Sequence, residues 1–90
     1  MANAARAYIL IECTVGRTKE VVTGLARLKG MKSVETVTGP YDVIAIVELA
    51  TLNEIGDLVT QHIHPITGIT RTVTCLVVSK KSLNIKIKDY

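Results

Sequence analysis

The apolar residues of this chain change their spacing several times, from the two-residue repeat of a strand to the wider repeat of a helix and back. Side chains alternate between the two faces of a strand, whereas those on one face of a helix recur about every 3.6 residues. The order of these changes restricts the possible folds more than any single motif does. It predicts strand, helix, strand, strand, helix and strand along the 90 residues.

Local signals place the ends of these elements. The strands are expected at Arg6–Cys13, about Ser33–Thr38, Val43–Leu49 and about Ile69–Val78. Thr18 is the expected N-cap of the first helix, which Gly30 ends. The second helix is expected to begin with a capping box, in which Thr51 and Glu54 each satisfy a free backbone donor, and to end before Pro65.

Two right-handed strand–helix–strand crossovers interleaved in this order give a ferredoxin-like βαββαβ sandwich. This α+β fold has a four-stranded antiparallel sheet with two helices on one face. The chain length allows one domain, residues 1–90. Within it, residues 79–90 are expected to form a tail or an extra edge strand, because Leu83, Ile85 and Ile87 alternate with polar residues.

The sheet face that carries no helix is expected to be unusually apolar. Along the strand Val43–Leu49, every second residue from Val43 to Leu49 is apolar, so this set is expected to face the helices. The residues between them point to the opposite face and still include Ile44 and Ile46. The expected outer residues of the first and third strands are Tyr8, Leu10, Glu12, Ile44, Ile46 and Glu48. A small domain has a thin stability margin and rarely leaves such a patch in water. We therefore predict a homodimer whose sheets pack face to face, as in a dimeric α/β barrel.

Composition disfavours several classes of protein. No apolar run approaches the roughly 20 residues of a membrane helix, and the N-terminus lacks the layout of a signal peptide. Two isolated cysteines, Cys13 and Cys75, form neither a disulfide framework nor a metal-ligand spacing, which favours reduced thiols in the cytoplasm. The net charge of +3 comes without a basic recognition stripe or stacking aromatics, so direct DNA binding is not expected.

Metal and acid–base chemistry find little support in the sequence. The two histidines, His62 and His64, sit at a helix end with no further Cys or His to complete a ligand set, so neither a metal site nor a cofactor is expected. Glu12 and Glu48 share the predicted outer face on neighbouring strands. They can act as an acid–base pair or can hydrogen-bond across a dimer interface, and the interface role is favoured.

A small zwitterion suits the remaining polar groups better. Asp42 ends the Gly39–Asp42 turn, directly before the most apolar strand, where its carboxylate can pair with an ammonium. Thr70, Thr72 and Thr74 place hydroxyls on one face of the last strand, expected at the other end of the sheet. Together with free turn amides, these hydroxyls can hold a carboxylate.

Three segments in a fixed order resemble a known family: Leu28–Val34, then Val37–Val43 (VTGPYDV), then Ile66–Thr74 (ITGITRTVT). They resemble the effector domain of the Lrp/AsnC feast/famine transcriptional regulators, also called the RAM domain, over about Ala7–Val78. The resemblance implies the ferredoxin-like fold, dimers that assemble into a ring such as an octamer or decamer, and an amino-acid effector bound between dimers.

The resemblance also implies the site residues. Gly39, Tyr41 and Asp42 would line the effector site, with Thr72 and Thr74 nearby. Family regulators carry a helix-turn-helix domain ahead of this module, and the chain looks like a stand-alone RAM domain without it. We therefore expect an oligomeric amino-acid sensor that takes part in transcriptional regulation of amino-acid metabolism by co-assembly with full-length Lrp/AsnC regulators.

Two other functions stay open from the sequence. A cofactor-free enzyme of the dimeric α/β-barrel type shares this topology and would need an enclosed cavity lined by Glu12 or His62. A scaffold without a ligand would have the oligomer itself as its function.

Overall fold

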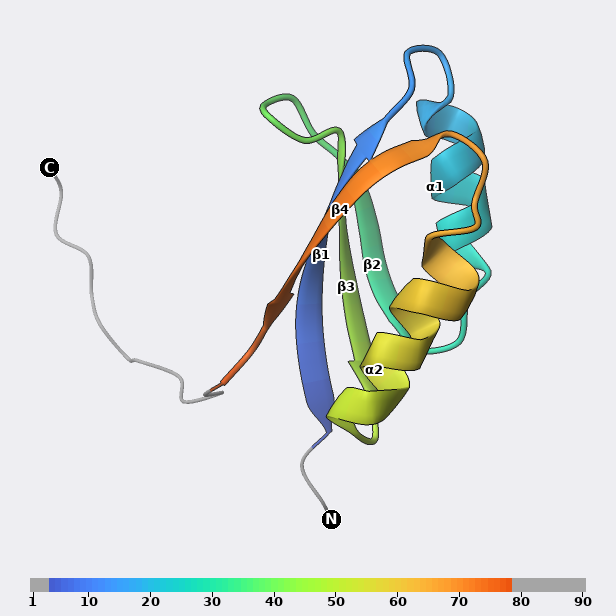
Figure 1. The fold of residues 1–90 in the computed structure, drawn as a ribbon. Coiled ribbons are helices and arrows are strands. Elements are labelled where there is room, and N and C mark those ends of the chain that lie inside the picture. The colour runs from blue at the N-terminus through green and yellow to red at the C-terminus, as the bar shows by residue number, and fades with distance from the viewer. Residues whose placement is uncertain (1–3, 79–90) are drawn as a thin grey trace, which may run out of the picture.

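The computed structural model describes residues 4–78. The elements are β1 (Ala5–Cys13), α1 (Thr18–Ala26), β2 (Met31–Thr36), β3 (Val43–Leu49), α2 (Leu52–Leu58), the π-helical turn η1 (Val59–Ile63) and β4 (Ile69–Leu76). The four strands form one antiparallel sheet in the order β2-β3-β1-β4. Figure 1 shows α1 and α2 on the same side of this sheet. The predicted ferredoxin-like fold is confirmed, while the predicted edge strand at Leu83–Ile87 lies outside the described residues.

The core fills the space between the helices and the sheet. Alternate residues of the two central strands are fully buried there: Ala7, Ile9 and Ile11 of β1, and Val43, Ala45 and Val47 of β3. The helical layer contributes Val21, Leu25, Ile55, Leu58, Val59 and Ile63. Because the side-chain repeat of a strand is two, this burial commits the other residues of β1 and β3 to the uncovered face. The faces predicted for both strands are therefore confirmed.

The two helices begin differently from one another. The N-cap of α1 is Arg17, which makes no side-chain capping hydrogen bond, so the prediction of Thr18 as the N-cap is wrong. At α2 the Thr51 hydroxyl accepts a hydrogen bond from the Glu54 N–H at 3.1 Å, as predicted.

The Glu54 carboxylate completes the start of α2 in a modified form of the capping box. It accepts a hydrogen bond from the backbone N–H of Ala50 at 3.2 Å, one residue before the expected donor, Thr51. At its other end, α2 widens into the π-helical turn, where the His64 N–H donates to the carbonyl of Val59 at 2.8 Å. Such widened turns are rare and occur often near functional sites.

A tight turn joins α1 to β2 and brings the chain against the end of β3. Gly30 has a positive φ of 85°, a conformation that only glycine adopts easily. Its carbonyl accepts a hydrogen bond from the Glu48 N–H at 2.9 Å. A Cβ at this position would lie only 2.6 Å from Cδ2 of Leu49 and 2.8 Å from the Glu48 carbonyl oxygen. Glycine is therefore required here both for its backbone angle and for its size.

Candidate functional site

The sheet face without helices has an apolar centre. The strand register sets Tyr8 opposite Ile46 and Leu10 opposite Ile44. On the other side of β1, Val73 and Cys75 of β4 continue the same two rows. We call these six residues the outer face: Tyr8, Leu10, Ile44, Ile46, Val73 and Cys75. Tyr8 is 38% exposed and Cys75 is exposed, while the other four are half-buried.

Charged residues border one end of the outer face. Arg6 and Glu48 form an ion pair with 3.2 Å between Nη1 and Oε2. The same guanidinium lies 5.8 Å from the centre of the Tyr8 ring. Its Nε is buried and has no hydrogen-bond partner among the described residues. A buried donor without an acceptor is costly, so the ion pair with Glu48 satisfies this guanidinium only in part.

The second charged border lies at the opposite end of the sheet, where Glu12 pairs in register with Arg71. Glu48 pairs with Arg6, and Glu12 lies six positions after Arg6 along β1, a distance of about 20 Å in an extended strand. Glu12 and Glu48 do share the outer side of the sheet, as predicted. Their separation excludes the acid–base pair that the sequence had left open.

The Gly39–Asp42 turn is fixed to the end of β1 through its last residue. The Asp42 carboxylate accepts a hydrogen bond at Oδ2 from the Cys13 N–H at 2.8 Å. The Asp42 N–H donates to the Ile11 carbonyl at 2.9 Å, and the Asp42 carbonyl accepts from the Val37 N–H at 2.9 Å. Gly39 and Pro40 are exposed at the tip of the turn. Pro40 has no N–H and that of Asp42 is already bonded, so the turn can offer a ligand only the N–H groups of Gly39 and Tyr41 while its carboxylate is held in place.

The Tyr41 side chain connects the turn with β4. The Arg71 guanidinium lies 5.6 Å from the centre of the Tyr41 ring, within range of a cation–π interaction. Arg71 is exposed and Tyr41 is half-buried. The turn and the start of β4 therefore lie at the same end of the sheet, on the two sides of β1. The expectation that they lie at opposite ends is wrong, because both β3 and β4 run antiparallel to β1.

The threonines of β4 face two different environments. Thr72 pairs with Ile11 and Thr74 with Ile9, which places both threonines on the helix-covered side of the sheet. The pairing register shifts between Glu12 and Cys13, so Thr70 lies at an irregularity in the ladder. The Thr70 hydroxyl lies 3.0 Å from Oε1 of Glu12, to which it donates.

His64 is a neighbour of the candidate site that the sequence did not identify. Its Nε2 lies 3.0 Å from the Thr72 hydroxyl. Both residues line a groove of about 220 Å³, together with Ile69, Thr70 and Arg71. The capping and helix-stop signals gave no hint of this contact, because it depends on the π-helical turn that carries His64 to β4. The groove contains Thr72 but not Tyr41 or Asp42, so one protomer does not gather all the predicted site residues around one cavity.

Cys13 lies beside the carboxylate of the turn. Burial raises the pKa of the Cys13 thiol above its ordinary value of 9.0, and the negative charge of Asp42 raises it further. The Thr18 hydroxyl opposes this rise by hydrogen bonding to the sulfur. Cys13 is therefore a neutral, half-buried thiol rather than a nucleophile.

Neither a cluster of metal ligands nor a membrane helix occurs in the part of the chain that the structure describes. Residues 4–78 contain no group of three or more His, Cys, Asp or Glu side chains arranged to hold a metal ion. Over the same residues, no helix has the length and apolar character needed to cross a membrane.

Together, the open βαββαβ sheet and the polar groups at its strand ends define a small ligand-binding domain. The family of Lrp/AsnC ligand binding domains matches residues 6–84, and the chain belongs to this family. The Lrp/AsnC ligand binding domain serves effector-binding transcriptional regulators, not enzymes, which confirms the predicted non-enzymatic role.

Individual relatives agree with this assignment. TTHA0845 from Thermus thermophilus is 34% identical, with a TM-score of 0.84 over 88% of this chain and 99% of that one. FFRP-DM1 is 30% identical, with a TM-score of 0.79 over 82% of this chain and 99% of that one. An uncharacterized HTH-type transcriptional regulator of Pyrococcus furiosus, PF0250, is 34% identical over 62% of this chain. The match spans only 37% of that regulator's length.

Proposed function

We propose that this domain binds a free amino acid as an oligomer and passes the signal on to transcriptional regulation of amino-acid metabolism. The observation that carries the proposal is the group of polar side chains at one end of the sheet. There the Asp42 carboxylate is fixed by the Cys13 N–H, the Tyr41 ring lies against Arg71 on the outer side of the sheet, and Thr72 lies on the helix-covered side. An amino acid presents an ammonium and a carboxylate, which suit a carboxylate and a set of hydroxyls and backbone amides respectively.

The division of these groups between two sides of the sheet supports a site shared between protomers. Asp42 uses Oδ2 to bind the Cys13 N–H, and its other oxygen, Oδ1, can accept from an ammonium. Thr72 and Thr74 of a neighbouring protomer, with the amides of the Gly39–Asp42 turn, then hold the effector carboxylate. Such a site would form only on assembly, so ligand binding and oligomer stability would be coupled.

The outer face supplies the first contact of the assembly. Its apolar centre can pack against a second copy with the sheets face to face, while Glu12 and Glu48 border the interface. Dimers formed in this way would associate further into a ring, an octamer or a decamer, through the ends that carry the Gly39–Asp42 turns.

The expected cellular partner is a full-length Lrp/AsnC regulator. Its ligand-binding domain would have the same fold, so the two chains can share one ring and one type of effector site. In this arrangement the partner supplies the DNA contacts, and the domain described here works in the cytoplasm without binding DNA directly.

The decisive experiment is size-exclusion chromatography with light scattering, together with thermal melting, with and without each of the twenty amino acids. The panel includes L-methionine, which is present in the solved structure of the regulator NMB0573, a protein of this fold. An assembly larger than a dimer whose mass or melting temperature responds to one amino acid is the expected result. A particle indifferent to all twenty would contradict the sensing role and favour a scaffold without a ligand.

A matched pair of variants locates the effector site. Asp42→Asn removes the charge that would pair with the effector ammonium and should weaken binding about tenfold or more. Glu20→Gln removes one carboxylate from an exposed ion pair with Arg17 on α1, and should leave binding unchanged. Equal affinities in the two variants would show that Asp42 does not contact the effector.

A further inference from the structure

A second groove lies at the opposite end of β3 from the Gly39–Asp42 turn. It has a volume of about 250 Å³ and runs between α2 and the turn that joins α1 to β2. Its lining residues are Lys29, Leu49, Glu54, Asp57, Leu58 and His62. Asp42 precedes β3 and Leu49 ends it, so the groove lies about 20 Å from the candidate effector site along the extended strand.

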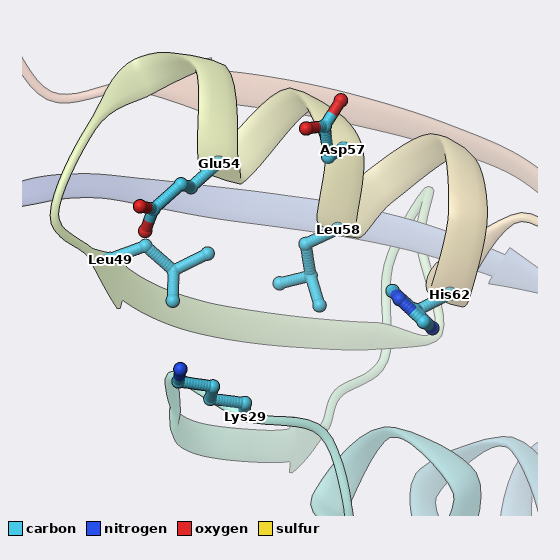
Figure 2. A pocket seen from close by; sticks show the side chains of 6 residues that line it. All are labelled: Lys29, Leu49, Glu54, Asp57, Leu58 and His62. Carbon is cyan, nitrogen blue, oxygen red and sulfur yellow. The ribbon is translucent and has the colours of Figure 1, made fainter.

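The bottom of the groove is apolar and held firmly. Figure 2 shows the side chains of Leu49 and Leu58 pointing into the space between α2 and the turn below it. Leu58 is only 6% exposed and belongs to the core. Leu49 packs against that core and against Gly30, whose missing side chain gives Leu49 its room. The two leucines therefore offer a preformed surface to an aliphatic group.

The rim of the groove carries opposite charges on opposite walls. Lys29 stands on the turn and Glu54 lies across from it on α2; Asp57 also lines the groove, with its carboxylate on the upper side of α2 in Figure 2. The Glu54 carboxylate is positioned by its hydrogen bond from the Ala50 N–H, at 3.2 Å. The His62 ring closes the end of the groove near η1. Neither Lys29 nor Asp57 takes part in an ion pair within residues 4–78.

We propose that this groove is a second binding site, specific for a zwitterionic α-amino acid with an aliphatic side chain. Lys29 binds the ligand carboxylate, the α2 carboxylates bind its ammonium, and its side chain rests on Leu49 and Leu58. A simple amine would leave Lys29 without a partner, and a simple carboxylate would leave the α2 carboxylates without one and be repelled by them. The volume is below the range of about 300–1,000 Å³ that holds drug-sized ligands, which suits a molecule of amino-acid size.

The test uses L-leucine as the probe, measured by isothermal titration calorimetry on the full chain. The Asp42→Asn variant serves as the background, because it weakens the proposed effector site and leaves the groove intact. This background should still bind L-leucine saturably. Adding Lys29→Met should weaken that binding about tenfold or more, the usual effect of losing a hydrogen bond to a charged group. Lys19→Met removes the same charge from an exposed position on α1 and should change nothing.

Two analogues test the requirement for both charges. The first is 3-methylbutylamine, which lacks the carboxylate of leucine, and the second is 4-methylpentanoate, which lacks its ammonium. Both analogues should bind more weakly than L-leucine to the Asp42→Asn background. A direct signal comes from the ring resonances of the two histidines, His62 and His64. In that background L-leucine should shift the His62 resonances and leave those of His64 in place.

The possible results separate this proposal from the effector site. If Asp42→Asn alone abolishes L-leucine binding, the effector site stands and the groove proposal fails. If Lys29→Met and Lys19→Met bind equally well, or if the amine binds as tightly as L-leucine, the groove proposal also fails. If Asp42→Asn binds as the wild type does and Lys29→Met loses binding, the groove is a site and L-leucine is not an effector at the Gly39–Asp42 turn.

Discussion

At the residue scale, the contact between Asp42 and Cys13 shows how one side chain joins the turn to the sheet. The carboxylate binds the Cys13 N–H at 2.8 Å where the β1 ladder becomes irregular. A free backbone donor at such a position needs a partner when it is half-buried. The same carboxylate is also part of the proposed effector site. The same carboxylate therefore both holds the turn against β1 and supplies the negative charge of the proposed effector site.

The Cys13 thiol gives a prediction about pH. Because burial and Asp42 raise its pKa in the folded protein, the fold favours the neutral thiol. This contribution to stability is fully present below the ordinary cysteine pKa and is lost as pH rises through the raised value. In a Cys75→Ser background, the alkylation rate of Cys13 should reach half its maximum at a higher pH than that of a free cysteine.

Asp42→Asn should shift this midpoint to a lower pH, because it removes the nearby negative charge. The rate of iodoacetamide modification followed by mass spectrometry measures both effects. A midpoint at or below that of free cysteine would show that the thiol is not held in its neutral form.

At the scale of the elements, the start of α2 depends on a local capping interaction. The Thr51 hydroxyl accepts from the Glu54 N–H, so Thr51→Ala should destabilise the protein by about 1 kcal/mol. The exposed Thr23 hydroxyl donates to the Lys19 carbonyl, four residues earlier in α1. That carbonyl lies inside the helix and does not depend on the hydroxyl for a partner. Thr23→Ala should therefore change the free energy of unfolding by less than about 0.5 kcal/mol. Urea unfolding of both variants makes the comparison, and equal losses would contradict the role of the cap.

The turn between α1 and β2 allows a comparison of two glycines with the same backbone angle. Gly16 and Gly30 both have φ of 85°, but a Cβ on Gly16 would meet nothing within 4 Å. Gly16→Ala should therefore cost only the left-handed conformation, about 1–2 kcal/mol. Gly30→Ala should cost about 1–3 kcal/mol more, because its Cβ would overlap Leu49 and the Glu48 carbonyl. Thermal and urea unfolding would test the difference, and equal costs would show that the close approach relaxes freely.

At the scale of the whole molecule, the helices leave one side of the sheet uncovered (Figure 1). The outer face gathers apolar residues from β1, β3 and β4 there, with charged residues at both ends. A patch of this kind on a chain of 9.8 kDa is typical of an association surface. The proposed effector site is divided between the two sides of the sheet, so both features favour an assembly as the working form.

A single charge on the outer face should disrupt that assembly. Ile44→Glu places a carboxylate opposite Leu10, where a face-to-face dimer would bury it without a partner. Sedimentation should then show a particle near the mass of one chain, with a lower melting temperature. Val15→Glu makes the same substitution in a loop where the side chain is 97% exposed, and should leave the mass unchanged. If the Ile44→Glu variant kept the wild-type mass, the interface would lie elsewhere.

The sequence alone determined the order of the elements and the face of each central strand. These properties depend on neighbours a few residues apart, so the repeats of β1 and β3 and the Thr51 cap could be read directly. The sequence also placed Asp42 and Tyr41 in a turn, and it grouped the threonines of β4 on one strand. Such local assignments need no knowledge of which strands lie side by side.

Only the tertiary structure decided which distant residues meet. The antiparallel register brought Arg71 over the Tyr41 ring, separated Glu12 from Glu48, and set Thr72 on the helix-covered side. The groove between Lys29 and α2 likewise joins segments that are far apart in the chain. Register is set by the packing of the whole sheet and by irregularities such as the shift at Glu12–Cys13, and neither of these can be read from a local repeat.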